Sequence, residues 1–245
     1  MAPSGAIVFG TLPLVFPHHF SWLPAILAVG LSGCATGVSP IGQIVSALVS
    51  DKLGPADASL IPAKPNPAYR YLRVEAEGRA PALLVLGYLD ADPPRQVEVW
   101  YSARGEVIRT RNGRIVGTAG LEVDWRGLRH PMEPPAWSAV PAQGASYQRS
   151  RDVFPGYRYG VSEQVTLAPL PAVPAIRLPA VLPIGLASSY QWFRETVTGS
   201  MQELPPAWFA WGMHQGQATV VYSEQCLSAT FCLKLLRWPL PEGAL

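Results

Sequence analysis

The sequence predicts a mainly β protein: a curved antiparallel sheet or barrel-like single domain, preceded by a short N-terminal amphipathic helix. Short strand patterns recur from residue 69 onward without intervening helical runs, which favours a sheet that curls into a barrel or sandwich. An Asn-Gly pair between two β-rich runs predicts a tight hairpin. The chain has 245 residues, 49% of them apolar, which suffices to bury a core.

The N-terminal segment has the composition of an export signal. Its first 50 residues contain no Asp, Glu, Lys or Arg. The apolar run LPAILAVGL, residues 23–31, is shorter than the about 20 residues that span a membrane. Leu31, Ser32, Gly33 and Cys34 resemble the lipobox of bacterial lipoproteins, although no Lys or Arg precedes the apolar run. We therefore predict a lipoprotein signal peptide over residues 1–33; the alternative is a buried thiol at the start of an ordinary domain.

The lipobox resemblance implies a modification and a location. In such lipoproteins the cysteine thiol carries a diacylglycerol, and cleavage makes the cysteine the new N-terminus, so Cys34 is the predicted lipidation site. Each buried CH₂ of an acyl chain such as palmitate contributes about 0.8 kcal/mol, and several chains anchor a protein stably. Ala35 stands where an aspartate would indicate inner-membrane retention. The resemblance therefore implies the outer membrane of a Gram-negative cell.

Residues 34–68 are predicted to form an anchor segment with one helix and a link. The helix, residues 41–53, ends at the stop signal Gly54-Pro55. It rests on four apolar residues at helical spacing: Ile41, Ile44, Val45 and Leu48. The proline-rich stretch IPAKPNP then leads into the predicted β-rich domain, residues 69–245.

Strand patterns fill most of this domain. Apolar and polar side chains alternate over residues 69–77, as in a half-buried strand, whereas residues 82–89 are apolar on both faces, as in a central strand. Asn112 and Gly113 join the two halves of residues 106–118 in a hairpin whose turn positions both need positive φ. The other predicted strands cover residues 96–102, 121–127, 145–152, 157–168, 191–198, 206–213 and 217–225.

Two proline-rich stretches, residues 131–141 and 169–183, interrupt the strand series. Proline cannot donate to a sheet ladder, so both stretches are predicted to be loops or edge excursions. Their Val, Ile and Leu content predicts that they lie against the sheet.

Cys226 and Cys232 are candidates for a disulfide in an oxidising periplasm. A fully extended chain would hold their Cα atoms roughly 20 Å apart, so the intervening LSATF must form a loop if the bond exists. The alternative is a pair of unbonded, small apolar side chains. We expect no metal site, since two thiols without further ligands nearby do not complete a tetrahedron.

Charge restricts the choice of partners. A net charge of +2 gives no argument for nucleic acid. Arg109, Arg111 and Arg114 crowd the predicted hairpin and form a weak candidate patch for glycans, acidic sugars or anionic head groups. The alternative is an ordinary solvated hairpin end.

The residues give no support to catalysis, and we predict no enzyme activity and no cofactor. No HExxH, GxSxG, P-loop or GxGxxG motif stands in a suitable context. Asp124, His130 and Glu133 are near one another in the chain, but HPMEPP is a proline-broken loop where polar residues are expected anyway.

The chain resembles the YjbF/GfcB-type lipoproteins, which are encoded with exopolysaccharide and group 4 capsule export genes. The resemblance runs from the lipobox to near the C-terminus and includes the helix after Cys34 and the strand series from Tyr69. It rests further on TRNGRIVGTAGL (residues 110–121), GASYQRSRDV (144–153) and VVYSEQCL (220–227), whose Ser-Glu-Gln matches a late motif of the family. It implies a β-rich, non-catalytic lipoprotein on the periplasmic face of the outer membrane, acting with polysaccharide export machinery or glycan. The cysteine pair and the prolines of residues 169–183 depart from the family pattern.

A second class of function stays open: a LolB-like lipid or lipoprotein carrier. Its sheet would enclose a continuous apolar cavity of several hundred Å³. An assembly factor, in contrast, can have a filled core and act through its outer surface.

Overall fold

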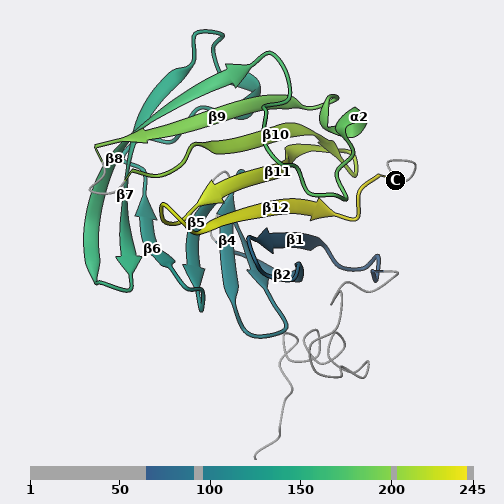
Figure 1. Ribbon diagram of the computed structural model, residues 1–245, viewed down its shortest axis with the longest axis horizontal. Coiled ribbons are helices and arrows are strands. Elements are labelled where there is room, and N and C mark those ends of the chain that lie inside the picture. Colours follow the sequence, from purple (N-terminus) through teal and green to yellow (C-terminus); the bar gives the residue numbers. More distant parts are fainter. Residues whose placement is uncertain (1–64, 91–95, 200–202, 242–245) are drawn as a thin grey trace, which may run out of the picture. The chain divides into compact units, whose positions relative to one another are not determined.

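The computed structural model describes residues 65–90, 96–199 and 203–241, which form one twelve-stranded antiparallel sheet. The strand order is β5-β4-β3-β2-β1-β12-β11-β10-β9-β8-β7-β6. Two meanders, β1 to β5 and β6 to β12, are therefore joined where the first strand pairs with the last. Figure 1 shows β1 beside β12, and the pairing runs from Tyr71 opposite Trp238 to Ala76 opposite Leu233.

The strands contain 5 to 13 residues each. The first meander consists of β1 (Tyr71–Ala76), β2 (Ala82–Asp90), β3 (Val97–Tyr101), β4 (Val107–Arg111) and β5 (Arg114–Ala119). The second consists of β6 (Asp124–Arg129), β7 (Ala145–Phe154), β8 (Arg158–Leu170), β9 (Gln191–Thr198), β10 (Ala207–His214), β11 (Gln217–Cys226) and β12 (Cys232–Trp238).

The two edge strands, β5 and β6, are tied together by side chains. Thr118 Oγ1 donates to Asp124 Oδ1 at 2.9 Å and accepts from the Trp125 N–H at 2.9 Å. The N–H groups of Gly120 and Leu121, in the loop between the strands, donate to the Asp124 carboxylate at 3.0 and 3.2 Å. The sheet is thereby nearly closed, as the predicted barrel-like architecture requires.

Side chains alternate between the interior and an outer apolar cluster. On β10, Phe209 and Trp211 belong to an interior cluster with Trp137, whereas Trp208 and Ala210 belong to the outer one. This alternation is the period of two expected for a strand. Trp208 is thus covered by another part of the chain instead of being left in solvent.

The cover of the outer cluster comes from the proline-rich stretch after β8. Its Val173, Ile176 and Leu182 pack on the outer faces of the C-terminal strands. The short helix α2 (Ile184–Ala187) continues this cover, and the Trp192 indole donates to the Ala187 carbonyl at 2.8 Å. Figure 1 shows α2 beside the ends of β9 and β10. The expectation that this stretch lies against the sheet is confirmed.

The first proline-rich stretch is also a loop, with a 3-10 turn η1 (Trp137–Ala139) that buries Trp137. The predicted strand at 121–127 is shifted to Asp124–Arg129, because the Asp124 carboxylate caps the preceding turn. Strand β12 was not predicted.

The predicted helix at 41–53 lies outside the described residues, and the domain limits stay predictions. None of the helices within the described ranges has the length and apolar content needed to span a bilayer.

Candidate functional site: the polar network at the β4–β5 turn

The turn between β4 and β5 has the conformation that its sequence predicts. Asn112 and Gly113 have φ angles of 51° and 77°, and Arg111 pairs with Arg114 across the turn. Asn112 is exposed at the tip of the turn, but Gly113 and Arg114 are buried. A Cβ atom at Gly113 would overlap with the side chain of Val220 on β11, so only glycine permits this approach. The first meander therefore contacts the second across the interior.

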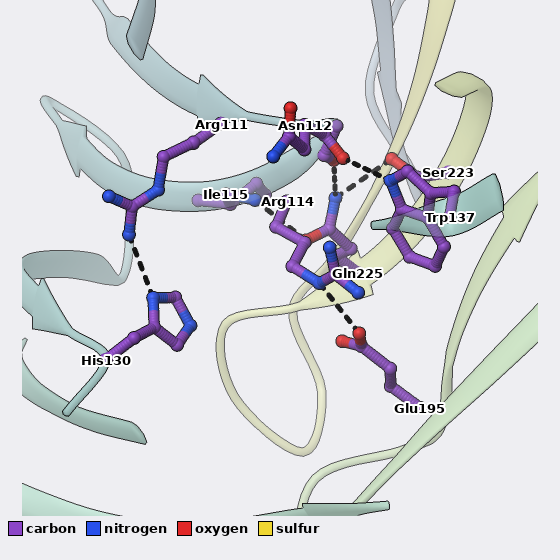
Figure 2. Close-up of polar contacts among 10 residues, drawn as sticks. Arg111, Asn112, Arg114, Ile115, His130, Trp137, Glu195, Ser223 and Gln225 are labelled. Carbon is purple, nitrogen blue, oxygen red and sulfur yellow. Dashed lines mark hydrogen bonds and ion pairs between the residues drawn. The ribbon is translucent and has the colours of Figure 1, made fainter. Parts of the chain in front are cut away.

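Gln225 on β11 fixes the turn in place (Figure 2). Its Nε2 donates to the Gly113 carbonyl at 2.9 Å and to Ser223 Oγ at 2.9 Å, and its Oε1 accepts from the Ile115 N–H at 2.9 Å. Gln225 and Ser223 are both buried. The Ser-Glu-Gln of the family resemblance thus uses its first and third residues to bind the hairpin of residues 110–121, while alternation directs Glu224 to the other face.

Two further residues hold the turn, Trp137 of the proline-rich loop and Glu195 of β9. The Trp137 indole donates to the Asn112 carbonyl at 2.8 Å. Arg114 Nε donates to Glu195 Oε1 on β9 at 2.8 Å, and its guanidinium carbon lies 3.8 Å from the centre of the Trp137 ring. Both members of the ion pair are buried. Removing one partner would leave an uncompensated buried charge, so the pair strongly favours this arrangement of the turn.

His130 lies beside the same turn, where Arg111 Nη2 and His130 Nδ1 are 2.9 Å apart (Figure 2). Burial, and then the positive charges of Arg111, Arg114 and Arg149, lower the pKa of His130 to about 4. The imidazole is therefore neutral at pH 7 and a weak base. Glu133 contacts Arg111 at 3.4 Å, whereas Asp124, at the start of β6, binds the β5–β6 loop. Their nearness in sequence thus does not make one acid/base cluster.

The three arginines of the candidate patch do not form one surface. Arg114 is buried, which corrects its placement in a solvent-facing patch: the turn lies against β11, so the residue after it faces the interior. Arg109 is exposed and pairs with Asp90. Arg111 is half-buried against His130. Only Arg109 and Arg111 remain candidates for binding a ligand.

A second buried network involves the other family motif, residues 144–153. Glu163 on β8 accepts from Arg149 Nε at 2.7 Å and from Arg151 Nη2 at 2.6 Å. Burial opposes ionisation of Glu163, but the two guanidinium groups outweigh it and lower its pKa. Both arginines stack on Trp125, whose indole donates to the Leu227 carbonyl at 2.9 Å. The motif thus connects β6, β7 and β8 to the β11–β12 turn.

The structure describes two of the three candidate cysteines, Cys226 and Cys232, but not Cys34. A disulfide joins Cys226 at the end of β11 to Cys232 at the start of β12, with the intervening residues forming the turn between the strands. Leu31, Ser32, Gly33 and Cys34 lie outside the described residues, so lipidation stays a prediction. Within the described part of the chain, no group of three or more His, Cys, Asp or Glu side chains is placed to hold a metal ion.

The described residues include two sizeable hollows. An apolar cavity of about 360 Å³ lies at one end of the sheet, lined by Val74, Leu84, Ile108 and Phe231, with Arg104 among its polar residues. A groove of about 340 Å³ is lined by residues of β4, β5 and β6, three of them arginines: Arg109, Arg111 and Arg126. The centre of the sheet, in contrast, is occupied by the contacts of the β4–β5 turn.

Sequence reasoning missed Glu195 and Trp137 as partners of the turn. A signal for Glu195 was present, since it shares one face of β9 with Phe193 and Val197, and a carboxylate on an apolar face needs a buried partner. Nothing in the proline-rich loop distinguishes Trp137, because the contact that buries it is made by a distant hairpin.

Comparison with known proteins agrees with the resemblance noted in the sequence. Residues 64–171 match the family described as group 4 capsule polysaccharide lipoprotein GfcB, YjbF. A solved structure, the hypothetical lipoprotein YmcC from Escherichia coli K12, has the same fold with a TM-score of 0.56 and 17% sequence identity, covering 83% of this chain and 97% of that one. No curated protein sequence matches significantly. The matched segment contains the hairpin of residues 110–121 and the network of Arg149, Arg151 and Glu163. Over residues 64–171 the chain is therefore similar to the group 4 capsule lipoprotein family.

Proposed function

We propose that this protein is a lipoprotein on the periplasmic face of the outer membrane that serves, without catalysis, in making or exporting an extracellular polysaccharide. The observation that carries the proposal is the match of residues 64–171 to the group 4 capsule lipoprotein family. The lipobox at Leu31–Cys34 supplies the anchor in this account.

The structural roles of the family motifs support an accessory function. The hairpin of residues 110–121 and the Ser-Glu-Gln of β11 bind each other through Gln225 and Gly113. The residues Arg149 and Arg151 are engaged in a buried network with Glu163. These motifs stabilise a nearly closed sheet, so the family pattern is accounted for by architecture, and contact with partners falls to the outer surface.

The carrier alternative is not favoured by the family match or by the interior. The apolar cavity of about 360 Å³ is confined to one end of the sheet. That volume is at the lower end of the range of about 300–1,000 Å³ for small-molecule pockets. The several acyl chains of a lipoprotein need a longer continuous cavity, whereas Gly113 lies directly against Val220 of β11 in the interior.

The proposal is tested by replacing the gene in the organism that encodes it with variants of the anchor. Cys34→Ser should abolish palmitate labelling, release the protein from membranes and fail to restore surface polysaccharide. Ala35→Asp, which keeps the cysteine, should remain labelled but move to the inner membrane. Full polysaccharide with an unlabelled, soluble Cys34→Ser protein would contradict the anchored function.

A further inference from the structure

The turn between β7 and β8 exposes aromatic rings to solvent. Tyr157 and Tyr159 are 72% and 67% exposed, which is unusual for large rings. They are not loose: both pack edge-on against Phe154, with ring centres 5.3 and 5.7 Å away. The three rings therefore form an ordered aromatic platform at the tip where β7 ends and β8 begins.

The backbone at this tip is left-handed at two successive residues of the hairpin connection. Tyr157 has a φ of 49°, a left-handed value that bulky residues rarely adopt. Gly156 beside it, with a φ of 100°, has no atom near its missing side chain. Strained backbone of this kind concentrates at binding sites. This conformation holds the Tyr157 ring in solvent, so the ring contributes nothing to the packing of the core.

Arginines adjoin the platform and present their charge outward. The guanidinium carbon of Arg126 lies 5.5 Å from the centre of the Phe154 ring. Arg126 contacts Asp124 at 3.9 Å, but its side chain is 57% exposed while that of Asp124 is 11% exposed. Arg129 and Asp152, 3.1 Å apart, show the same asymmetry. The carboxylates lie inward and the guanidinium groups outward, so the surface offered to a ligand is positive.

Asp152 connects the arginines to the platform. Its Oδ2 accepts from Arg129 at 3.1 Å, and its Oδ1 accepts from the N–H of Gly160, near the start of β8, at 2.8 Å. Gly127, with a φ of 59°, lets the Arg129 guanidinium cross its backbone to reach Asp152, because a side chain there would collide with both groups. The positions of ring and charge are thus set by the fold.

The surface continues into the groove between β4, β5 and β6. Arg126 both stacks on Phe154 and lines this groove, together with Arg109 and Arg111. Arg126 thus connects the aromatic rings to a groove that carries two further arginines, an arrangement that suits an extended anionic chain.

We propose that this surface, formed by Phe154, Tyr157, Tyr159, Arg126 and Arg129, binds an acidic polysaccharide. The tyrosine rings would stack on the apolar faces of the sugar rings, and the arginines would bind the carboxylates of uronic acid units. The inference rests on the proposed function and names its ligand class: an anionic glycan chain, bound through alternate stacking and charge pairing.

The test is a binding titration of the purified full chain, in detergent, with an oligogalacturonate as the acidic probe and a neutral galactan oligomer of the same length. Tyr157→Ala with Tyr159→Ala should weaken binding of the oligogalacturonate at least about tenfold, equivalent to the loss of about 1.4 kcal/mol. Arg126→Gln should weaken it several-fold and reduce its dependence on salt.

Matched controls exist elsewhere on the chain. Arg79 is similarly exposed, pairs with Glu122 and stacks 5.3 Å from the Phe231 ring, so Arg79→Gln repeats the chemical change of Arg126→Gln at another place. Tyr69 is exposed and packs edge-on against Tyr71, which makes Tyr69→Ala the control for the tyrosines. Both controls should bind the oligogalacturonate like the wild type.

Three outcomes would overturn the inference: no binding of the oligogalacturonate, equal binding of the neutral oligomer, or equal loss in the controls. Binding to vesicles of anionic lipid without binding to the oligogalacturonate would also overturn it and assign the surface to a membrane. If polysaccharide export fails in the deletion strain while the purified chain binds no acidic glycan, the proposed function stands and this inference falls.

Discussion

Gln225 and Gly113 are 112 residues apart in the chain, yet the Gln225 amide donates to the Gly113 carbonyl at 2.9 Å inside the sheet. This contact joins the two meanders across the interior. It also explains why the Asn-Gly of residues 110–121 and the Ser-Glu-Gln of β11 occur in the same chain. The hairpin supplies the Gly113 carbonyl and the Ile115 N–H, and β11 supplies the Gln225 amide that binds both.

Replacing Gln225 by Ala should destabilise the fold. The change leaves the Gly113 carbonyl and the Ile115 N–H buried without a partner, each at a cost of about 1–3 kcal/mol. We expect a loss of about 3 kcal/mol in the free energy of unfolding, measured by urea denaturation. Gln191→Ala removes an exposed glutamine that also donates to a backbone carbonyl, and should cost under about 1 kcal/mol. Equal losses in the two variants would contradict the role of Gln225.

Gly113→Ala should be far more harmful than Gly216→Ala. Both glycines follow a residue at positive φ in a two-residue turn, with φ angles of 77° and 78°. Only Gly113 faces a neighbour, Val220, whereas Gly216 faces open space. Left-handed strain costs each about 1 kcal/mol, and overpacking adds about 1–3 kcal/mol at Gly113 alone. The thermal unfolding midpoints of the two variants test this, and equal midpoints would contradict the close approach of Gly113 to Val220.

Breaking the Arg114–Glu195 pair should cost about 3–5 kcal/mol, because Arg114→Met leaves the Glu195 carboxylate buried without a counter-charge. Replacing both residues by Met should be much less harmful than the single change. The exposed pair Arg79–Glu122 supplies the control, since Arg79→Met should cost under about 1 kcal/mol. Chemical denaturation of these three variants measures the differences, and a double variant as unstable as the single one would argue against a buried ion pair.

The lowered pKa of His130 predicts a pH dependence of stability. The histidine of the unfolded chain takes up a proton near pH 6.5. In the folded protein, burial and the positive charge of Arg111 oppose protonation, so the imidazole takes up a proton only near pH 4. Between these values the unfolded state binds more protons, so the free energy of unfolding falls as the pH is lowered from 6.5 towards 4. The wild type should lose more stability over this window than His130→Gln. Parallel curves for the two proteins would show that His130 has an ordinary pKa when folded.

Local patterns predicted the features that depend on neighbouring residues. The turn at Asn112 and Gly113 needs two residues that accept positive φ, and the sequence there admits few alternatives. Most of the proline-rich stretch 169–183 was correctly predicted to lie against the sheet, because proline disfavours a ladder while the apolar residues require burial. Pro169 and Leu170 are the exception, since they extend β8 and pair with β9.

Features that depend on distant contacts could not be predicted. Strand β12 lacks alternation because Leu235 faces the interior while Leu236 faces the outer cluster, so both faces are apolar and the period of two disappears. Arg114 follows a hairpin tip, where solvent is the usual surrounding. Only the pairing of β1 with β12, which curls the sheet, brings this tip against β11.

The most direct test of the proposed function is the amount of surface polysaccharide after deletion of the gene, measured beside the same strain complemented with the wild-type gene. The proposal predicts that polysaccharide is lost on deletion and restored by the wild type, while other outer-membrane lipoproteins stay in place. Unchanged polysaccharide together with mislocalised lipoproteins would contradict it and would indicate the carrier function instead.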